Sequence, residues 1–283
     1  MFSDIRLPPL RDMLVRHVFM PSPDAATQAR IDILNVSNLE LQREVEATQL
    51  AQQAAEQMLR QQTERLAIVA HELNNPMMAL SAATVLLSRG TPEMVLRMQA
   101  VIARQTAQMK RLIEDLLDVS RVATGKLRLL PGRLDIEVTV NAALEGCRAD
   151  IDKRRQTLQL TMPSQPGDMI GDSVRLAQIL GNLVGNASKY TPDGGEISLV
   201  VERRAGEIVF SVADNGIGMA PPALLKVFEP FVQEEHAVSF NHAGLGLGLA
   251  LVRELVHAHG GSVEAHSDGL GCGSRFTVTI PSG

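Results

Sequence analysis

The sequence predicts a long helical region followed by an α/β domain. Up to Gly125, apolar residues recur at alternating steps of three and four, which is typical of helices that pack along a seam. After residues 129–133 (LLPGR), the pattern changes to alternating helices and strands. We therefore expect an antiparallel helical hairpin that forms a dimeric four-helix bundle, followed by an α/β sandwich.

The composition narrows the range of functions to expect. The chain has 283 residues and 45% hydrophobic residues, enough for two modest domains. Its net charge of -5 gives no reason to expect nucleic-acid binding, which usually shows as a basic patch. Cys147 and Cys272 form neither a metal-type spacing nor a disulfide framework, which fits a reducing compartment. With no transmembrane run and no signal peptide in the sequence, a cytoplasmic protein is expected.

The first part of the chain predicts a tail and a coiled coil. Residues 1–25 contain four prolines and indicate no role. A long helix is predicted from about Asp24, whose carboxylate suits an N-cap. Polar residues interrupt its seven-residue register, so we expect residues 26–63 to be a signalling helix whose register can shift. An ordinary amphipathic helix within one chain is the alternative. The apolar positions are Leu34, Leu41, Val45, Ala55, Leu59, Leu66, Val69 and Leu73.

Residues 64–127 predict a helical hairpin. A tight turn is expected at residues 88–92 (SRGTP), and Gly125 is a stop signal for the second helix. Each helix has a single apolar stripe, and two such helices cannot enclose a core alone. Pairing with a second copy closes the bundle, so an obligate homodimer is expected. The stripe of the second helix is Val95, Met98, Ile102, Gln105, Met109, Leu112, Leu116 and Val119.

Residues 132–283 predict the α/β domain. Helical periodicity and strand alternation follow one another, with Asp172 suited to cap the second helix. The expected helices span residues 136–153, 172–190 and 246–259, and the expected strands span residues 157–162, 196–202, 207–213, 262–266 and 275–280.

Two motifs of this domain suggest a binding site for a polyphosphate and a nucleotide base. Asn182 and Asn186 lie four apart on one helix face, and their amide oxygens suit hydrated Mg²⁺, while Lys189 adds a positive charge. Asp214 ends a strand beside Gly216 and Gly218, as an acceptor for an adenine amine would. A polar solvent face and a plain Asp-Asn-Gly turn are the respective alternatives.

A third motif suggests anion binding. Gly244, Gly246 and Gly248 precede a helix, where backbone donors and the helix N-terminus favour phosphate. The spacing matches neither the Walker nor the Rossmann pattern. Residues 228–231 (Phe-Glu-Pro-Phe) and the polar segment to His242 suit a nucleotide-covering lid. A glycine-rich turn alone is weak evidence for phosphate binding, so the argument depends on all of these motifs together.

His71 is the candidate nucleophile of the hairpin. In the predicted register it lies off the seam and faces solvent. An exposed helical His is usually only a surface residue, but Glu72, Asn75 and Pro76 around it favour chemistry. A neutral imidazole is a nucleophile near physiological pH, and Glu72 is placed to orient the ring and accept its proton. Pro76 lacks a backbone donor and is expected to bend the helix.

In order and spacing these motifs resemble the histidine kinases of two-component systems, whose catalytic half belongs to the gyrase, Hsp90, histidine kinase and MutL ATPase superfamily. The resemblance covers about residues 64–281. It is carried by residues 70–76 (AHELNNP), 180–192 (LGNLVGNASKYTP), 214–218 (DNGIG), 228–231 (FEPF), 244–249 (GLGLGL), 259–261 (HGG) and 271–276 (GCGSRF).

The resemblance implies ATP as phosphate donor and Mg²⁺ as its metal. His71 would be phosphorylated and would pass the phosphate to an aspartate of a separate response regulator. Asn75 would orient water against the phosphorylated regulator, which predicts phosphatase activity. The implied nucleotide-site roles are Asn186 as metal ligand, Asp214 as adenine reader, Asn182, Lys189 and Tyr190 beside phosphates and metal, Gly216 and Gly218 in the adenine pocket, and Gly244, Gly246 and Gly248 in the lid hinge.

Other functions stay open at this stage. An ATP-binding scaffold or phosphatase with weak kinase activity would leave His71 unlabelled. A non-kinase ATPase of the same superfamily would hydrolyse ATP without phosphohistidine, although the hairpin argues against it. No recognisable sensor module fits in the N-terminal residues, so the input is expected from a separate sensor or a membrane-associated partner.

Overall fold

The structure, a computed structural model, describes residues 24–87, 91–165, 167–232 and 245–283. The chain divides into one unit up to Thr63 and another from Glu64 to Gly283. Each unit is described by itself. The N-terminal tail, residues 1–23, lies outside the described residues.

The first unit contains the N-terminal part of helix α1 (Ala25–Leu87). The Oδ1 atom of Asp24 accepts a hydrogen bond of 2.7 Å from the backbone N–H of Thr27, as expected of an N-cap. The seam residues Leu34, Leu41 and Leu59 are 55–64% exposed in the single chain. These side chains are therefore largely open to solvent, and no described residue of this unit buries them.

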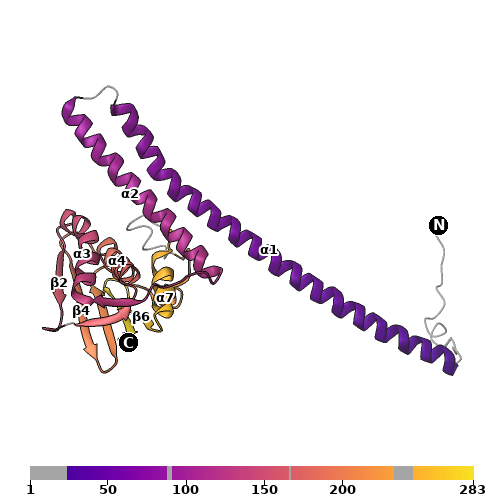
Figure 1. Ribbon diagram of the computed structural model, residues 1–283. Coiled ribbons are helices and arrows are strands. Elements are labelled where there is room, and N and C mark those ends of the chain that lie inside the picture. Colours follow the sequence, from indigo (N-terminus) through magenta and orange to yellow (C-terminus); the bar gives the residue numbers. More distant parts are fainter. Residues whose placement is uncertain (1–23, 88–90, 166, 233–244) are drawn as a thin grey trace, which may run out of the picture. The chain divides into compact units, whose positions relative to one another are not determined.

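The second unit begins with the hairpin. Helix α1 continues through Pro76 to Leu87, and α2 (Pro92–Ala123) runs back in the opposite direction (Figure 1). Thr91 caps α2 by accepting a hydrogen bond from Met94, and Pro92 occupies the first turn, where no backbone donor is needed. Gly125 has φ +64°, so it ends the helix in the left-handed region. Ser88–Gly90 of the predicted turn lie outside the described residues.

A five-stranded mixed sheet forms the centre of the α/β domain (Figure 1). Strand β2 is parallel to β4, and the other neighbours are antiparallel. The β4–β5 hairpin closes by pairing Arg204 with Glu207. In sheet order the strands are β2 (Thr157–Thr161), β4 (Glu196–Arg204), β5 (Glu207–Asp214), β7 (Ser274–Pro281) and β6 (Ser262–His266).

Three helices share one aliphatic core with this sheet: α3 (Ile136–Lys153), α4 (Ser173–Tyr190) and α7 (Gly248–Ala258). Asp172 caps α4 by accepting from the N–H groups of Val174 and Arg175, at 3.1 and 3.2 Å. The apolar stripe of α4 is fully buried, so its opposite face carries the polar residues of the candidate site. Leu176, Ile179, Leu180 and Leu183 form that stripe.

Two short strands were not predicted. Strands β1 (Gly132–Asp135) and β3 (Asp168–Gly171) pair in an antiparallel two-stranded sheet that places Leu134 opposite Met169. Both of these side chains are at most 5% exposed. Four-residue strands are too short to show an alternation, so their pairing is visible only in the fold. A single-turn helix, α5 (Pro221–Leu224), also escaped prediction.

Among the described residues, no helix combines the length and the apolar character that crossing a membrane requires.

Candidate nucleotide and phosphotransfer site

Helix α4 carries two amides on the face away from the core. Asn182 and Asn186 lie one turn apart, as the sequence predicted. The Nδ2 atom of Asn182 is buried and has no hydrogen-bond partner in the described part of the chain. A buried donor without a partner is destabilising, so this atom is available to donate to a group outside the described residues.

The first turn of α7 lies beside these amides. A Cβ added to Gly248 would be 3.6 Å from the Oδ1 atom of Asn182 and 4.0 Å from the Nδ2 atom of Asn186. The absence of a side chain at Gly248 leaves space next to the backbone N–H groups of an 11-residue helix. Those groups and the helix dipole favour an anion at this position.

Gly246 gives the chain its entry into α7. It has φ +68°, and a Cβ there would lie 2.8 Å from the carbonyl oxygen of Val232. This close approach ties the glycine-rich segment to residues 231–232, because the N–H of Phe231 also donates to the carbonyl of Gly246 at 3.1 Å. Gly244 and the predicted lid from residue 233 to His242 lie outside the described residues.

Asp214 ends strand β5 in a largely buried position. Its Oδ1 atom accepts a hydrogen bond of 2.8 Å from the N–H of Gly216. Burial raises the pKa of Asp214, although hydrogen bonds from the backbone of Gly216 and Ser274 oppose the effect. A half-buried carboxylate with a remaining lone pair favours a ligand that donates a hydrogen bond.

The glycines that follow Asp214 are required by close backbone contacts. A Cβ on Gly216 would lie 2.3 Å from the carbonyl oxygen of Tyr190, and one on Gly218 would lie 2.0 Å from that of Gly269. Gly218 also has φ +65°. The loop after β5 therefore packs on the C-terminal end of α4, which brings Asp214 to the helix that carries Asn182 and Asn186.

Lys189 and Tyr190 lie at the end of α4. The Nζ atom of Lys189 donates to the Tyr190 hydroxyl at 2.8 Å and stands 4.6 Å from the centre of its ring. The ammonium group therefore stays near the site, but its observed contact is with Tyr190. A bound phosphate would have to compete with this contact or share the ammonium group.

Phe228 and Phe231 connect the site to the rest of the unit. Phe228 packs edge-on against Phe276, with 6.2 Å between ring centres. Phe231 has φ +66°, which is unusual for a residue with a side chain, and its ring lies 5.5 Å from the guanidinium carbon of Arg65 on α1. The start of the predicted lid is thus in contact with the hairpin.

His71 lies on α1 with 73% of its side chain exposed. Its Nδ1 atom is 3.6 Å from the Oε1 atom of Glu72, which is too long for a hydrogen bond. Glu72 is buried, at 8% exposure, and so is Pro76, whereas Asn75 is exposed. The expected outward orientation of His71 is confirmed, and Glu72 faces one nitrogen of the ring.

The structure therefore brings the sequence-predicted residues together in two groups. Helix α4, the loop after β5 and the start of α7 converge on one site, and His71 with Glu72 and Asn75 forms the other. This arrangement defines a class of protein: an α/β domain with a candidate site for an anion and a base, preceded by a hairpin with an exposed histidine.

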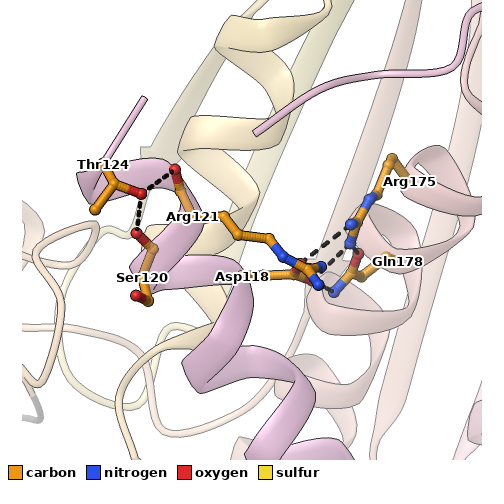
Figure 2. A network of polar contacts seen from close by, with 6 residues as sticks. All are labelled: Asp118, Ser120, Arg121, Thr124, Arg175 and Gln178. Atoms are coloured by element: carbon orange, nitrogen blue, oxygen red, sulfur yellow. Dashed lines mark hydrogen bonds and ion pairs between the residues drawn. The ribbon is translucent and has the colours of Figure 1, made fainter. Parts of the chain in front are cut away.

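Sequence reasoning missed a polar network that joins the hairpin to the α/β domain (Figure 2). Asp118 on α2 accepts hydrogen bonds from Arg121 of the same helix and from Arg175 and Gln178 of α4. A lone acid between the stripe residues Leu116 and Val119 was the only sequence signal for it. Its partners on α4 are 57 and 60 residues away, so the periodicity of α2 could not identify them.

Comparison with known families identifies both parts of the chain. Residues 61–125 match the His Kinase A (phospho-acceptor) domain, and residues 171–283 match the histidine kinase-, DNA gyrase B- and HSP90-like ATPase domain. These ranges contain His71 and the nucleotide-site residues, respectively. The chain belongs to the sensor histidine kinases.

Individual relatives agree with this assignment. The sensor histidine kinase RcsC of Escherichia coli is 31% identical over 83% of this chain and 25% of its own length. The sensor-like histidine kinase SenX3 of Mycolicibacterium smegmatis is 31% identical over 76% of this chain and 56% of its own length. The chain thus spans from a quarter to about half of these two relatives.

A solved structure agrees as well. Full-length ShkA in complex with AMPPNP is 31% identical, with a TM-score of 0.57 over 77% of this chain and 45% of that chain. The similarity therefore extends over both the hairpin region and the α/β domain.

Proposed function

We propose that the protein is an ATP-dependent protein-histidine kinase that phosphorylates its own His71. The observation that carries the proposal is the pairing of a nucleotide-type site on α4, β5 and α7 with an exposed, Glu72-flanked histidine in the phospho-acceptor domain. The site in the α/β domain would bind ATP, the phosphate donor, and the hairpin carries His71, the phosphate acceptor.

ATP fits the residues present. The orphaned Nδ2 atom of Asn182 and the open first turn of α7 at Gly248 are donors for phosphate oxygens. Asp214 is a half-buried acceptor for the exocyclic amine of adenine. Lys189 adds positive charge at the same helix end. The AMPPNP bound by ShkA supports the same ligand class here.

Mg²⁺ is proposed as the metal, with the Oδ1 atom of Asn186 as its ligand. When bound, it would neutralise charge on the phosphates during transfer. The site fits a weakly held, largely hydrated ion, because the described residues contain no cluster of acidic, His or Cys side chains that would hold a metal by themselves. Metal binding should therefore depend on the nucleotide.

The transfer step follows from the geometry around His71. Because Glu72 faces Nδ1, Nε2 is the free nucleophile. Nε2 forms a bond to the γ-phosphorus while the bond from that phosphorus to the β-bridging oxygen breaks, and ADP leaves. The ring becomes positively charged, and Glu72 stabilises or removes the proton on Nδ1. A small side-chain rotation would shorten the present separation to hydrogen-bond length.

A response regulator is proposed as the second substrate, receiving the phosphate on an aspartate. Asn75, exposed one helical turn after His71, is placed to orient water for the reverse dephosphorylation. A homodimer is proposed because large apolar side chains on both helices of the hairpin are open to solvent in the single chain, with Leu66 69% and Leu96 68% exposed. Input would come from a separate sensor or a membrane-associated partner.

Autophosphorylation tests the proposal directly. Wild-type protein should take up label from γ-labelled ATP with Mg²⁺, in a form stable to base and labile to acid. His71→Gln and Asn186→Ala should lose the label, whereas His257→Gln, at an exposed helical histidine of α7, should keep it. Label on the His71→Gln protein would contradict the assigned acceptor.

A scaffold or phosphatase with weak kinase activity is the alternative, and the same experiment separates it. Wild-type protein that binds ATP but acquires no label at His71 would favour the alternative. Steady ATP hydrolysis without phosphohistidine would instead favour a non-kinase ATPase.

A further inference from the structure

A glycine-rich loop between β6 and β7 packs against the loop that follows β5. The N–H groups of Gly271 and Gly273 donate to the carbonyls of Ile217 and Gly216, at 2.7 and 3.1 Å. The two loops are therefore held together backbone to backbone beside the proposed adenine site. We call residues 267–273 the supporting loop.

The supporting loop has little conformational constraint of its own. Gly269, Gly271 and Gly273 all have positive φ, at +125°, +78° and +71°. Because glycine adopts many backbone conformations at similar cost, these residues do not by themselves give the loop one shape. A Cβ on Gly273 would lie 2.0 Å from the carbonyl oxygen of Asp214, so no larger residue could replace the glycine at this contact. The shape of the loop therefore depends on its hydrogen bonds.

Ser267, at the start of the supporting loop, makes several of these hydrogen bonds with one hydroxyl. Its Oγ atom donates to the carbonyl of Gly273 at 2.7 Å, and the alternative acceptor, the carbonyl of Gly269, is farther away at 3.3 Å. The same Oγ atom accepts from the N–H groups of Met219 at 3.0 Å and Gly269 at 3.4 Å. A serine hydroxyl has one donor and two lone pairs, so Ser267 uses its whole hydrogen-bonding capacity. It joins the two ends of the supporting loop to the loop after β5.

The peptide unit between Gly273 and Ser274 connects this hydroxyl to Asp214. Its carbonyl accepts from Ser267, and its N–H donates to the Asp214 carboxylate, which opposes the rise in the pKa of Asp214 that burial causes. A peptide unit is planar, so a fixed carbonyl also fixes the direction of the N–H group. Donation to the carbonyl polarises the unit and strengthens its N–H as a donor.

Asp214 thus receives hydrogen bonds from two directions. The N–H of Gly216 belongs to its own loop, and the N–H of Ser274 belongs to β7. A carboxylate held in this way can accept from the exocyclic amine of adenine. It would repel a base that presents a carbonyl oxygen at the same place, because both groups are acceptors. The orientation of Asp214 therefore bears on which purine the site prefers.

We propose that Ser267 is a positioning residue for Asp214: through the Gly273–Ser274 peptide it orients the carboxylate and sets the preference for adenine. The inference deepens the proposed function and rests on it, because it takes the region around Asp214 as the adenine site. Ser267 itself would not contact the base.

The test compares binding of ADP and IDP to the full chain. IDP carries a carbonyl oxygen in place of the adenine amine, and neither nucleotide has a γ-phosphate to transfer. Ser267→Ala should lower the ratio of ADP affinity to IDP affinity about threefold or more, because Asp214 would be less well oriented. A merely structural role would weaken both nucleotides equally. Both affinities come from the same sample, so an unfolded fraction does not change their ratio.

Two further variants at Ser267 test the hydroxyl itself. Ser267→Thr keeps the hydroxyl and should restore the wild-type ratio. Ser267→Cys keeps the shape with a weaker donor and should give an intermediate ratio, which also serves should the alanine variant fail to fold. Thr139→Val is the matched control, because Thr139 on α3 donates its hydroxyl to the carbonyl of Asp135 at 2.7 Å. It should keep the wild-type ratio.

Asp214→Asn distinguishes failure of this inference from failure of the proposed adenine site. It should lower the ratio by itself, and adding Ser267→Ala should lower it no further, because both changes act through one carboxylate. If Asp214→Asn lowers the ratio but Ser267→Ala does not, or if the two effects add, the positioning role is overturned and the adenine site stands. If Asp214→Asn leaves the ratio unchanged, the adenine role of Asp214 fails, and the inference about Ser267 is overturned with it.

Discussion

Asn182 and Gly248 face each other across the space between α4 and α7. A Cβ on Gly248 would stand 3.6 Å from the Oδ1 atom of Asn182, while the Nδ2 atom of Asn182 is buried without a partner in the described chain. A donor without a partner among the described residues and an open helix start thus lie together, and this is the place that we propose for phosphate oxygens.

Asn182→Ala should therefore separate ligand binding from stability. Because Nδ2 makes no hydrogen bond within the described protein, its loss should change the free energy of unfolding by less than about 1 kcal/mol. ATP binding should weaken about tenfold or more, since a phosphate would lose its donor. Calorimetric titration with ATP and thermal unfolding without ligand measure the two effects. A large loss of stability without nucleotide would contradict this view of the side chain.

Gln156 offers the matched control for that experiment. It is also a buried amide, but it donates to the carbonyls of Ser188 and Thr191 and accepts from the Ser188 hydroxyl at 2.7 Å. Gln156→Ala should destabilise the protein by about 2–4 kcal/mol, because it leaves buried groups unsatisfied. Its effect should appear in the unfolding temperature of the free protein.

Gly218→Ala should damage the loop after β5. A Cβ there would lie 2.0 Å from the carbonyl oxygen of Gly269, and the residue has φ +65°. We expect a loss of at least about 2 kcal/mol in unfolding free energy, with weaker nucleotide binding. Gly181→Ala is the control, since its Cβ would meet nothing within 4 Å in the middle of α4. That change should stabilise the protein by about 0.5–1 kcal/mol. Equal effects of the two changes in urea unfolding would refute the argument.

Asp115 on α2 predicts a pH-dependent stability. Burial, with the nearby charges of Asp118 and Glu114, raises its pKa from 3.8 to about 6, against the opposing charge of Arg111. The folded state then binds the proton more tightly than the unfolded state, so stability falls as pH rises from about 4 to about 6.

Asp115→Asn should accordingly raise stability at pH 7.5 by about 1–3 kcal/mol, and the gain should vanish as pH falls toward 4. Thermal unfolding across this pH range is the measurement. Glu114→Gln is the control, because Glu114 is 54% exposed and pairs with Lys110 only at 3.8 Å. It should change stability by less than about 1 kcal/mol at any pH in the range. A constant Asp115→Asn effect across the range would count against the raised pKa.

Asn75→Ala should separate the two proposed activities. The side chain is exposed on the His71 face, one turn along α1, so its removal should leave the fold and the labelling of His71 close to wild type. Dephosphorylation of the phosphorylated regulator should slow about tenfold or more, because the attacking water loses its orienting group. Dephosphorylation at the wild-type rate would remove Asn75 from this role.

Much of the fold was accessible from local pattern. The helix predicted at residues 136–153 and the strand predicted at residues 262–266 coincide with α3 and β6, since each shows one uninterrupted periodicity with clear end signals. Asp24 and Asp172 cap their helices as predicted, because capping depends only on neighbours within three residues. The strands β1 and β3 were missed, because their pairing joins residues about 36 positions apart.

The candidate site likewise has features that the sequence predicted and features that it could not predict. Residue types and spacing singled out Asn182, Asn186 and Asp214, since the chemistry of a phosphate and a base requires those groups near glycines. The glycines at 216 and 218 were also visible in the sequence. The reason for each was not: a Cβ added there would lie only 2.3 or 2.0 Å from a backbone carbonyl oxygen. Such contacts involve Tyr190 and Gly269, whose approach depends on how β5 and α4 pack.

By itself, the sequence determined the two-part organisation, the exposed position of His71 and the candidates for the nucleotide site, because these depend on periodicity and on side-chain chemistry within single elements. Only the tertiary structure decided that the Nδ2 atom of Asn182 lacks a partner among the described residues, that Asp118 pairs with Arg175, and that Arg65 contacts Phe231. The physical reason is that hydrogen bonds and burial between distant elements depend on packing. Periodicity along one helix gives its faces but not the residues that those faces contact.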